Sequence, residues 1–239
     1  MNSENNSKKK TKKKSVLKNR LINNFSYAFI KITGAIPTLL ALRPKVIYKT
    51  KKPNTRGGLL ISVNHVGMID PIIVLAIFKW RNPHFLATDN LYRNKISATF
   101  FGLLYCIKTN RDNFSIAAFH TVVERLENGY AIVIFPEGQI NRTEQGGVLP
   151  FKSGVSLMAY KSGAPVLPVY IVKRSKWYQR QRVVIGEPID VRALVGDKPS
   201  IDRINSISDV LQQKELELRD YYEENFNKKK TKNKNSEVM

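Results

Sequence analysis

The chain has 239 residues, of which 42% are hydrophobic, so it is long and apolar enough for one folded domain with appended segments, and global disorder is excluded. Its 40 basic and 19 acidic residues leave a formal charge of +21, which attracts polyanions such as nucleic acid or an anionic membrane surface. The single cysteine, Cys106, excludes an intramolecular disulfide framework and a cysteine-rich metal site, and fits a reducing cytoplasm. No secretory signal peptide is expected, because no compact apolar core follows the basic start.

Much of the positive charge lies at the two ends of the chain, in lysine runs at residues 8–14 and 228–232. Such runs bury no apolar surface, so residues 1–20 and 227–239 are predicted to be basic, disordered tails. Two interpretations remain open. The tails either aid solubility alone, or attract anionic lipid with about 1 kcal/mol per basic residue held near the surface.

Residues 21–42 form the most apolar stretch near the N-terminus, but Lys31, Gly34 and Pro37 interrupt it, which argues against a membrane crossing. On a helix, its polar and small residues share one stripe: Asn24, Tyr27, Lys31, Gly34 and Thr38. This pattern is typical of a helix that lies in the membrane interface and breaks near Pro37. Residues 21–50 are therefore predicted to be a membrane-interface helical segment. The alternative is a helix packed on the protein's own core.

From residue 51 to residue 226, short apolar runs alternate with helical patterns. The expected strands cover residues 59–63, 84–88, 130–135, 165–172 and 182–185. The expected helices cover residues 71–80, 97–107, 115–126, 154–161 and 200–226. Strands that alternate with helices predict an α/β fold with a mostly parallel central sheet flanked by helices.

Polar residues follow the first of these strands, where ligand sites of open α/β sheets gather. His65 comes directly after the strand, next to Asn64, and Asp70 precedes Pro71 at the start of a helix. A turn at Gly67 would let the two side chains meet, and a histidine held by a carboxylate is a good general base. The alternative is structural, with Asp70 as a helix cap and His65 as an ordinary loop residue.

A second polar segment follows the most apolar strand. Glu137 and Gly138 are predicted to lie in a loop, with Arg142 close behind and Lys152 before the next helix. Cations near a helix N-terminus form a reasonable phosphate site. The alternative for Glu137 is a local ion pair with Arg142.

Four segments together resemble the glycerolipid acyltransferases, specifically the 1-acylglycerol-3-phosphate acyltransferase family. They are Asn64-His65 with Asp70, residues 135–138, residues 151–154 with 166–169, and residues 184–188. The resemblance covers roughly residues 53–190 and assigns residues 51–226 to an acyltransferase domain. Two segments depart from the family pattern: residues 139–142 stand where the family commonly has Thr-Arg, and residues 106–111 replace a glycine-led apolar run.

The resemblance implies a role for each matching residue. His65 would be the general base, oriented by Asp70, and Asn64 belongs to the same motif. Glu137, Gly138, Arg142 and Lys152 would contribute to the acceptor site. Arg111 looks like the arginine that contacts the glycerol phosphate, and Pro168 would help to position the acyl chain or the acceptor. No metal or bound cofactor is implied, because the donor, acyl-coenzyme A or acyl carrier protein, carries the activated acyl group.

The expected function is transfer of a fatty acyl group to the sn-2 hydroxyl of 1-acylglycerol-3-phosphate, which forms phosphatidic acid in phospholipid biosynthesis. The expected location is peripheral or monotopic, on the cytoplasmic face of a membrane. The alternatives are another lysophospholipid acceptor, or a non-catalytic protein that binds membranes or nucleic acid. Nucleic acid is not the expected partner, because the lysines cluster in the tails and no binding motif interleaves basic and aromatic residues.

Overall fold

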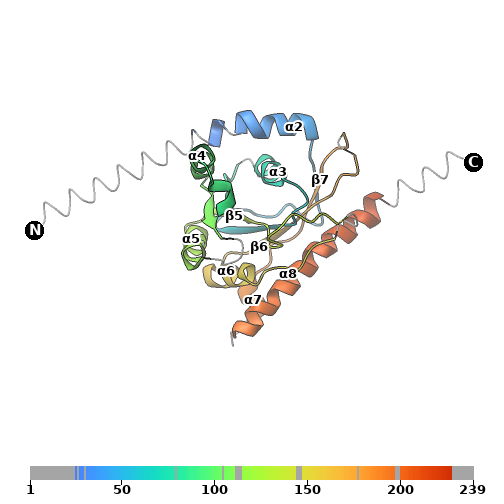
Figure 1. The fold of residues 1–239 in the computed structure, drawn as a ribbon. Coiled ribbons are helices and arrows are strands. Elements are labelled where there is room, and N and C mark those ends of the chain that lie inside the picture. Colours follow the sequence, from blue (N-terminus) through green and yellow to red (C-terminus); the bar gives the residue numbers. More distant parts are fainter. Residues whose placement is uncertain are drawn as a thin grey trace, which may run out of the picture.

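A seven-stranded sheet organises the protein in the computed structural model, which describes residues 25, 27–29, 31–78, 80–103, 105–110, 115–143, 147–176, 178–196 and 200–227 (Figure 1). The spatial order of the strands is β1-β7-β6-β2-β5-β3-β4. All neighbouring strands are parallel except β6 and β7, which pair antiparallel. The strands are β1 (Lys45–Tyr48), β2 (Leu59–Val63), β3 (His84–Thr88), β4 (Ile107–Thr109), β5 (Ala131–Ile134), β6 (Val166–Ile171) and β7 (Arg182–Ile185). The predicted α/β fold with a mostly parallel sheet is confirmed.

Helices cover both faces of this sheet (Figure 1). One face carries the π-helical turn η1 (Lys31–Ala35), α2 (Ile36–Leu42) and α3 (Asp70–Ile77). The other carries α5 (Ile116–Glu127), α6 (Gly154–Ser162), α7 (Val191–Val195) and the long α8 (Ile201–Tyr222). The remaining helical segments are the 3-10 turn η2 (Asp89–Tyr92), α4 (Lys95–Leu103) and the π-helical turn η3 (Glu223–Asn227).

The central strand β2 is buried along its whole length because both of its faces are covered. Leu59 and Ile61 pack in a cluster with residues of α3, whereas Leu60 packs with residues of α5, α6 and α8. This alternation follows from the two-residue period of a strand. It explains why β5 is continuously apolar and β2 is apolar except at Ser62, as is typical of strands in the middle of a parallel sheet.

The predicted break near Pro37 is not present, because the N-terminal segment stays helical from residue 31 to residue 42 and only changes from π-helical to α-helical geometry before Pro37. Residues 31–35 form a π-helical turn, and Pro37 then occupies the first turn of α2, where its missing amide hydrogen is not needed. The inward stripe contains Tyr27, which is only 1% exposed and donates its hydroxyl to the carbonyl of Pro83 at 2.8 Å. The opposite side of the helix is apolar and exposed, at Phe25, Phe29, Ile32, Ile36 and Leu40.

Several element predictions need correction. The helix expected over residues 97–107 ends at Leu103, because Tyr105 adopts a left-handed backbone with φ 53° and Ile107 then begins β4. Neither β4 nor the short helix α7 was predicted. β1 lies inside the segment 21–50 that was expected to be helical, and it pairs with β7 at the edge of the sheet. In the described part of the chain, no helix is both long and apolar enough to cross a membrane.

Candidate active site

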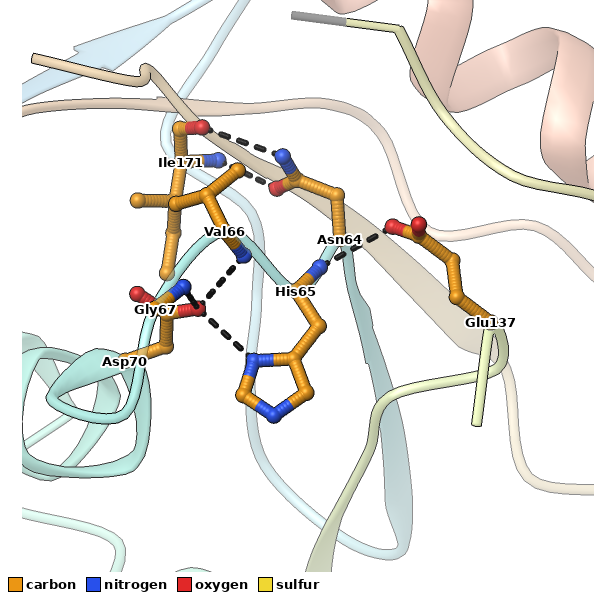
Figure 2. Close-up of polar contacts among 7 residues, drawn as sticks. All are labelled: Asn64, His65, Val66, Gly67, Asp70, Glu137 and Ile171. Carbon is orange, nitrogen blue, oxygen red and sulfur yellow. Dashed lines mark hydrogen bonds and ion pairs between the residues drawn. The ribbon is translucent and has the colours of Figure 1, made fainter. Parts of the chain in front are cut away.

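His65 and Asp70 meet at the carboxyl end of β2, as predicted (Figure 2). The ring nitrogen Nδ1 of His65 lies 2.9 Å from Oδ2 of Asp70. The same oxygen also accepts the backbone amides of Val66 at 2.7 Å and Gly67 at 2.8 Å. Because an ionised carboxylate only accepts hydrogen bonds, this contact places the proton of the neutral imidazole on Nδ1. Nε2 is then the basic nitrogen.

The position of Asp70 follows from the local sequence. Asp70 is the first residue of α3, with Pro71 next to it, so its side chain can turn back over the loop that precedes the helix. Its amide donates to the carbonyl of Gly67 at 3.2 Å, which closes the turn. Gly67 is not required for this turn. A Cβ there would lie 3.7 Å from Oδ1 of Asp70, an ordinary van der Waals contact.

The imidazole of His65 is partly enclosed, with a side-chain exposure of 18%, whereas the Asp70 side chain is only 2% exposed. The ring stacks on Phe135, with 4.3 Å between the ring centres. In Figure 2, Nε2 points away from both Asp70 and Glu137. The histidine therefore presents one basic nitrogen outward, while the carboxylate that orients it is shielded from water.

Glu137 supports the loop that carries His65. Its Oε1 accepts the amide of His65 at 2.9 Å, and its Oε2 accepts the amide of Leu149 at 3.1 Å (Figure 2). The side chain is 5% exposed, and this burial raises the pKa of the carboxyl, although the two amide hydrogen bonds oppose the shift. Backbone amides thus occupy both oxygens of Glu137, while Arg142 has an exposed side chain.

Asn64 joins the ends of two strands beneath the site. Its side-chain amide donates to the carbonyl of Ile171 at 3.0 Å, and its Oδ1 accepts the amide of Ile171 at 2.6 Å (Figure 2). Asn64 is completely buried, so it does not present its side chain to a ligand from solvent. It holds the carboxyl end of β2 against β6.

Steric crowding explains why position 138 is a glycine. Its backbone is left-handed, with φ 68°, and an added Cβ would lie 2.8 Å from Cε of Lys152. The aliphatic chain of Lys152 therefore passes directly over Gly138. The structure brings these two predicted residues together, 14 positions apart, beside Glu137.

The remaining predicted residues lie elsewhere. Arg111 is outside the described residues. Pro168 is buried within β6, in register with Ser62 of β2, and its carbonyl accepts the amide of Gly186 at 3.0 Å. The structure thus places Pro168 inside the sheet rather than beside His65. No cluster of three or more His, Cys, Asp or Glu side chains in the described ranges is arranged to hold a metal ion.

Sequence reasoning did not identify Asn141 as part of the site. Its amide donates to the carbonyl of His65 at 2.6 Å, and its side-chain amide donates to the carbonyl of Gly147 at 2.7 Å. Asn141 is 4% exposed. It therefore fastens the loop after β5 to the loop that carries His65. Its buried polar contacts could be found only once the two loops were seen side by side.

Comparisons with known proteins identify the family of the chain. The Acyltransferase family model matches residues 43–172. The 1-acyl-sn-glycerol-3-phosphate acyltransferase of Bacillus subtilis (strain 168) is 26% identical over 191 residues, which cover 77% of this chain and 94% of that protein. The enzyme of the same name from Borreliella burgdorferi is 30% identical over 156 residues, or 63% of this chain and 61% of that protein.

The crystal structure of the 1-acyl-sn-glycerophosphate (LPA) acyltransferase PlsC from Thermotoga maritima has a similar fold, with a TM-score of 0.56 at 20% identity. The match covers 85% of this chain and 97% of that chain. The family model spans more than half of the chain and contains the segment with His65, Asp70 and Glu137. The chain belongs to the Acyltransferase family.

Proposed function

We propose that this chain transfers a fatty acyl group from a thioester, acyl-coenzyme A or acyl-acyl carrier protein, to the sn-2 hydroxyl of 1-acylglycerol-3-phosphate. The observation that carries the proposal is the pair His65–Asp70, joined at 2.9 Å at the carboxyl end of the central strand. The relatives from Bacillus subtilis and Borreliella burgdorferi are 1-acyl-sn-glycerol-3-phosphate acyltransferases by name, which supports the choice of acceptor.

In the proposed reaction, Nε2 of His65 accepts the proton of the acceptor hydroxyl as its oxygen attacks the thioester carbonyl carbon. Asp70 stabilises the imidazolium that forms, and general-base help of this kind typically contributes about 10²–10⁴-fold in rate. The carbon–oxygen bond forms, the carbon–sulfur bond breaks, and the imidazolium returns its proton to the leaving thiolate. The products are phosphatidic acid and the free thiol of the carrier.

The acceptor carries a phosphate, and cations near His65 offer sites for it. The Lys152 side chain passes over Gly138, and Arg142 has an exposed side chain on the loop after β5. We propose that these residues and Arg111 bind the acceptor, with Glu137 and Asn64 holding the loops in place.

We also propose that the protein sits on the cytoplasmic face of a membrane through its N-terminal helical segment. The exposed apolar side of that segment, at Phe25, Phe29, Ile32, Ile36 and Leu40, supports this proposal. The residues recur every three or four positions and form one face of a helix, as expected for an interfacial helix. An enzyme seated there can reach a membrane-bound acceptor without extracting it into water.

The test is a transfer assay with purified protein, both labelled thioester donors and a panel of lysophospholipids in mixed micelles. Acylation of lysophosphatidic acid that disappears in His65→Ala, with folding intact, is the expected result. His120→Ala is the matched control, because this histidine is exposed on α5. Activity retained in His65→Ala would refute the mechanism. Acylation of a different lysophospholipid would show that this other lipid, rather than lysophosphatidic acid, is the acceptor. Absence of transfer with every combination of thioester donor and lysophospholipid acceptor would favour a non-catalytic membrane-binding protein.

A further inference from the structure

The loop that connects β6 to β7 is strongly basic and lies beside the catalytic loop. Residues 173–181 contain four cations, Lys173, Arg174, Lys176 and Arg180, and Arg182 follows as the first residue of β7. Lys173 and Lys176 have exposed side chains, and Arg174 is half-buried. None of these residues belongs to a motif that the family resemblance assigned.

A hollow of about 200 Å³ separates this basic loop from the loop that carries His65. Lys173, Arg174 and Lys176 line it on one side, and Val66, Gly67 and Asp70 line it on the other. Asp70 is the acidic residue among these, and its Oδ2 already accepts three hydrogen bonds. The lining therefore carries three positive charges against one negative charge, and the Oδ2 oxygen of that negative group is engaged by its own donors.

The basic loop and the cations considered above follow different neighbours of β2 in the sheet. β2 ends at His65 and has β5 and β6 as its two neighbours. Arg142 and Lys152 follow β5, whereas Lys173, Arg174 and Lys176 follow β6. Nζ of Lys173 donates to the carbonyl of Thr143 at 2.8 Å, and this hydrogen bond connects the segment after β6 to the segment after β5.

The same loop is attached to the end of the N-terminal helix (Figure 1). The amide of Gln181 donates to the carbonyl of Leu42 at 3.0 Å, and the carbonyl of Gln181 accepts the amide of Lys45 at 2.8 Å. Gln181 itself lines the hollow. The cationic hollow is therefore held next to α2, whose exposed side is apolar.

We propose that Lys173, Arg174 and Lys176 form a binding site for the phosphate of a glycerolipid headgroup. Arginine and lysine side chains bind phosphate through charge-assisted hydrogen bonds, and the guanidinium of arginine can do so with two at once. The adjoining apolar side of α2 places the acyl chains of such a lipid within the same surface. The choice of a glycerolipid as the ligand rests on the proposed function. Its occupant is either the acceptor itself or an anionic lipid of the surrounding bilayer.

The test compares two full-length variants that each lose three positive charges. One is Lys173→Gln/Arg174→Gln/Lys176→Gln. The matched control is Lys161→Gln/Arg203→Gln/Lys214→Gln, whose residues are exposed on α6 and α8, on the opposite face of the sheet. Binding is measured to vesicles of phosphatidylcholine alone and of phosphatidylcholine with an equal amount of phosphatidic acid. A second arm measures the shift in Tm caused by monomeric short-chain lysophosphatidic acid.

The loop variant is expected to bind the anionic vesicles or the short-chain lipid about 10–100-fold more weakly than the control, in line with three lost contacts to anionic lipid. Loss confined to vesicles identifies the bilayer lipid as occupant, and loss of the short-chain lipid identifies the acceptor. Equal binding by both variants in both arms would overturn the site. Neither arm requires turnover, so an inactive protein would refute the proposed function without affecting this result. Should the triple variant unfold, Lys176→Gln alone provides the same comparison against Lys161→Gln.

Discussion

Asp70 accepts three hydrogen bonds through one carboxylate oxygen, from His65, Val66 and Gly67, at 2.7–2.9 Å. An ionised group that is 1% exposed would be costly without such donors. The two amides hold the carboxylate in place, and the carboxylate in turn holds one orientation and one tautomer of the imidazole. The orientation of His65 therefore depends on a residue that no substrate needs to touch.

Asp70→Asn should lower kcat by about 10²–10⁴-fold, because the amide carries no charge to stabilise the imidazolium. KM should change little, since Asp70 positions His65 rather than binding the acceptor. The measurement is steady-state kinetics, with the far-ultraviolet circular dichroism spectrum as a check on folding. Asp209→Asn, at an exposed position on α8, is the control and should behave as the parent protein. A kcat within twofold of the parent in Asp70→Asn would exclude this positioning role.

Glu215 of α8 is a second buried carboxyl, and it has no part in the proposed reaction. It is completely buried, its Oε1 accepts the hydroxyl of Ser62 at 2.6 Å, and its Oε2 has no hydrogen-bond partner among the described residues. This burial raises the pKa of Glu215 well above its ordinary value. The folded protein therefore keeps a proton that the unfolded chain releases above its ordinary pKa of about 4.5.

It follows that the stability linked to Glu215 is complete below that ordinary pKa and decreases as the pH rises toward the raised one. Glu215→Gln keeps an acceptor for Ser62 and cannot ionise. This variant should have a higher Tm at pH 8 and a smaller decline of Tm with pH. The expected rise in Tm is roughly 2–4 °C for each ~1 kcal/mol of unfolding free energy that is regained. Thermal unfolding from pH 5 to pH 9 measures this. A parallel decline in both proteins would show that other groups cause it.

The residues of the site differ in how far the sequence could reveal them. His65, Asp70 and Glu137 stand where apolar strands end, which is a local signal. The structure joins His65 to Asp70 as expected, whereas the bond from the His65 amide to Glu137 was not expected. Asn141 acts through contacts with a loop 76 positions earlier, and no local pattern encodes such a pairing. The turn expected at Gly67 is present, but its backbone there is open to other residues, so the glycine itself is not what makes the turn possible.

At the scale of elements, strong continuous patterns predicted the fold and short ones did not. β2 and β3 were predicted with the bounds they have, because Gly, Pro or Asn residues flank each apolar run. β4 has three residues and adjoins an apolar helix, so periodicity alone could not separate the two. β1 depends on pairing with β7, which begins 137 residues later, so its strand character comes from tertiary contact.

The connection between β2 and β6 gives a test at this scale. Asn64→Ala removes both hydrogen bonds to Ile171 and leaves a buried amide and carbonyl without partners, which should cost about 2–4 kcal/mol of unfolding free energy. Urea unfolding measures the loss, and kcat should decrease as well because His65 follows Asn64 directly. Asn90→Ala, at an exposed position, is the control. A change below about 0.5 kcal/mol in Asn64→Ala would show that water replaces the lost contacts.

At the scale of the whole molecule, charge and apolar surface are separated along the chain. The exposed apolar residues of the N-terminal helical segment form one face, and the lysine runs lie in residues 8–14 and 228–232, beyond the described residues. Apolar contact with lipid is insensitive to salt, whereas attraction of lysines to anionic headgroups weakens beyond a Debye length of about 8–10 Å at physiological salt. The two contributions to membrane binding can therefore be measured separately.

A chain restricted to residues 21–227 lacks both lysine runs and should bind anionic vesicles at least tenfold more weakly, with less dependence on salt. Its acyl transfer in detergent micelles should stay within about twofold of the parent, because His65, Asp70 and Glu137 are retained.

Full-length Ile36→Ser/Leu40→Ser is the complementary variant, since it loses apolar contact but keeps every lysine. It should bind neutral vesicles weakly and keep its salt dependence. If the shortened chain lost transfer in detergent at an unchanged Tm, the tails would take part in the reaction itself. If it lost a strong affinity for duplex DNA instead, the positive charge would serve nucleic acid rather than lipid.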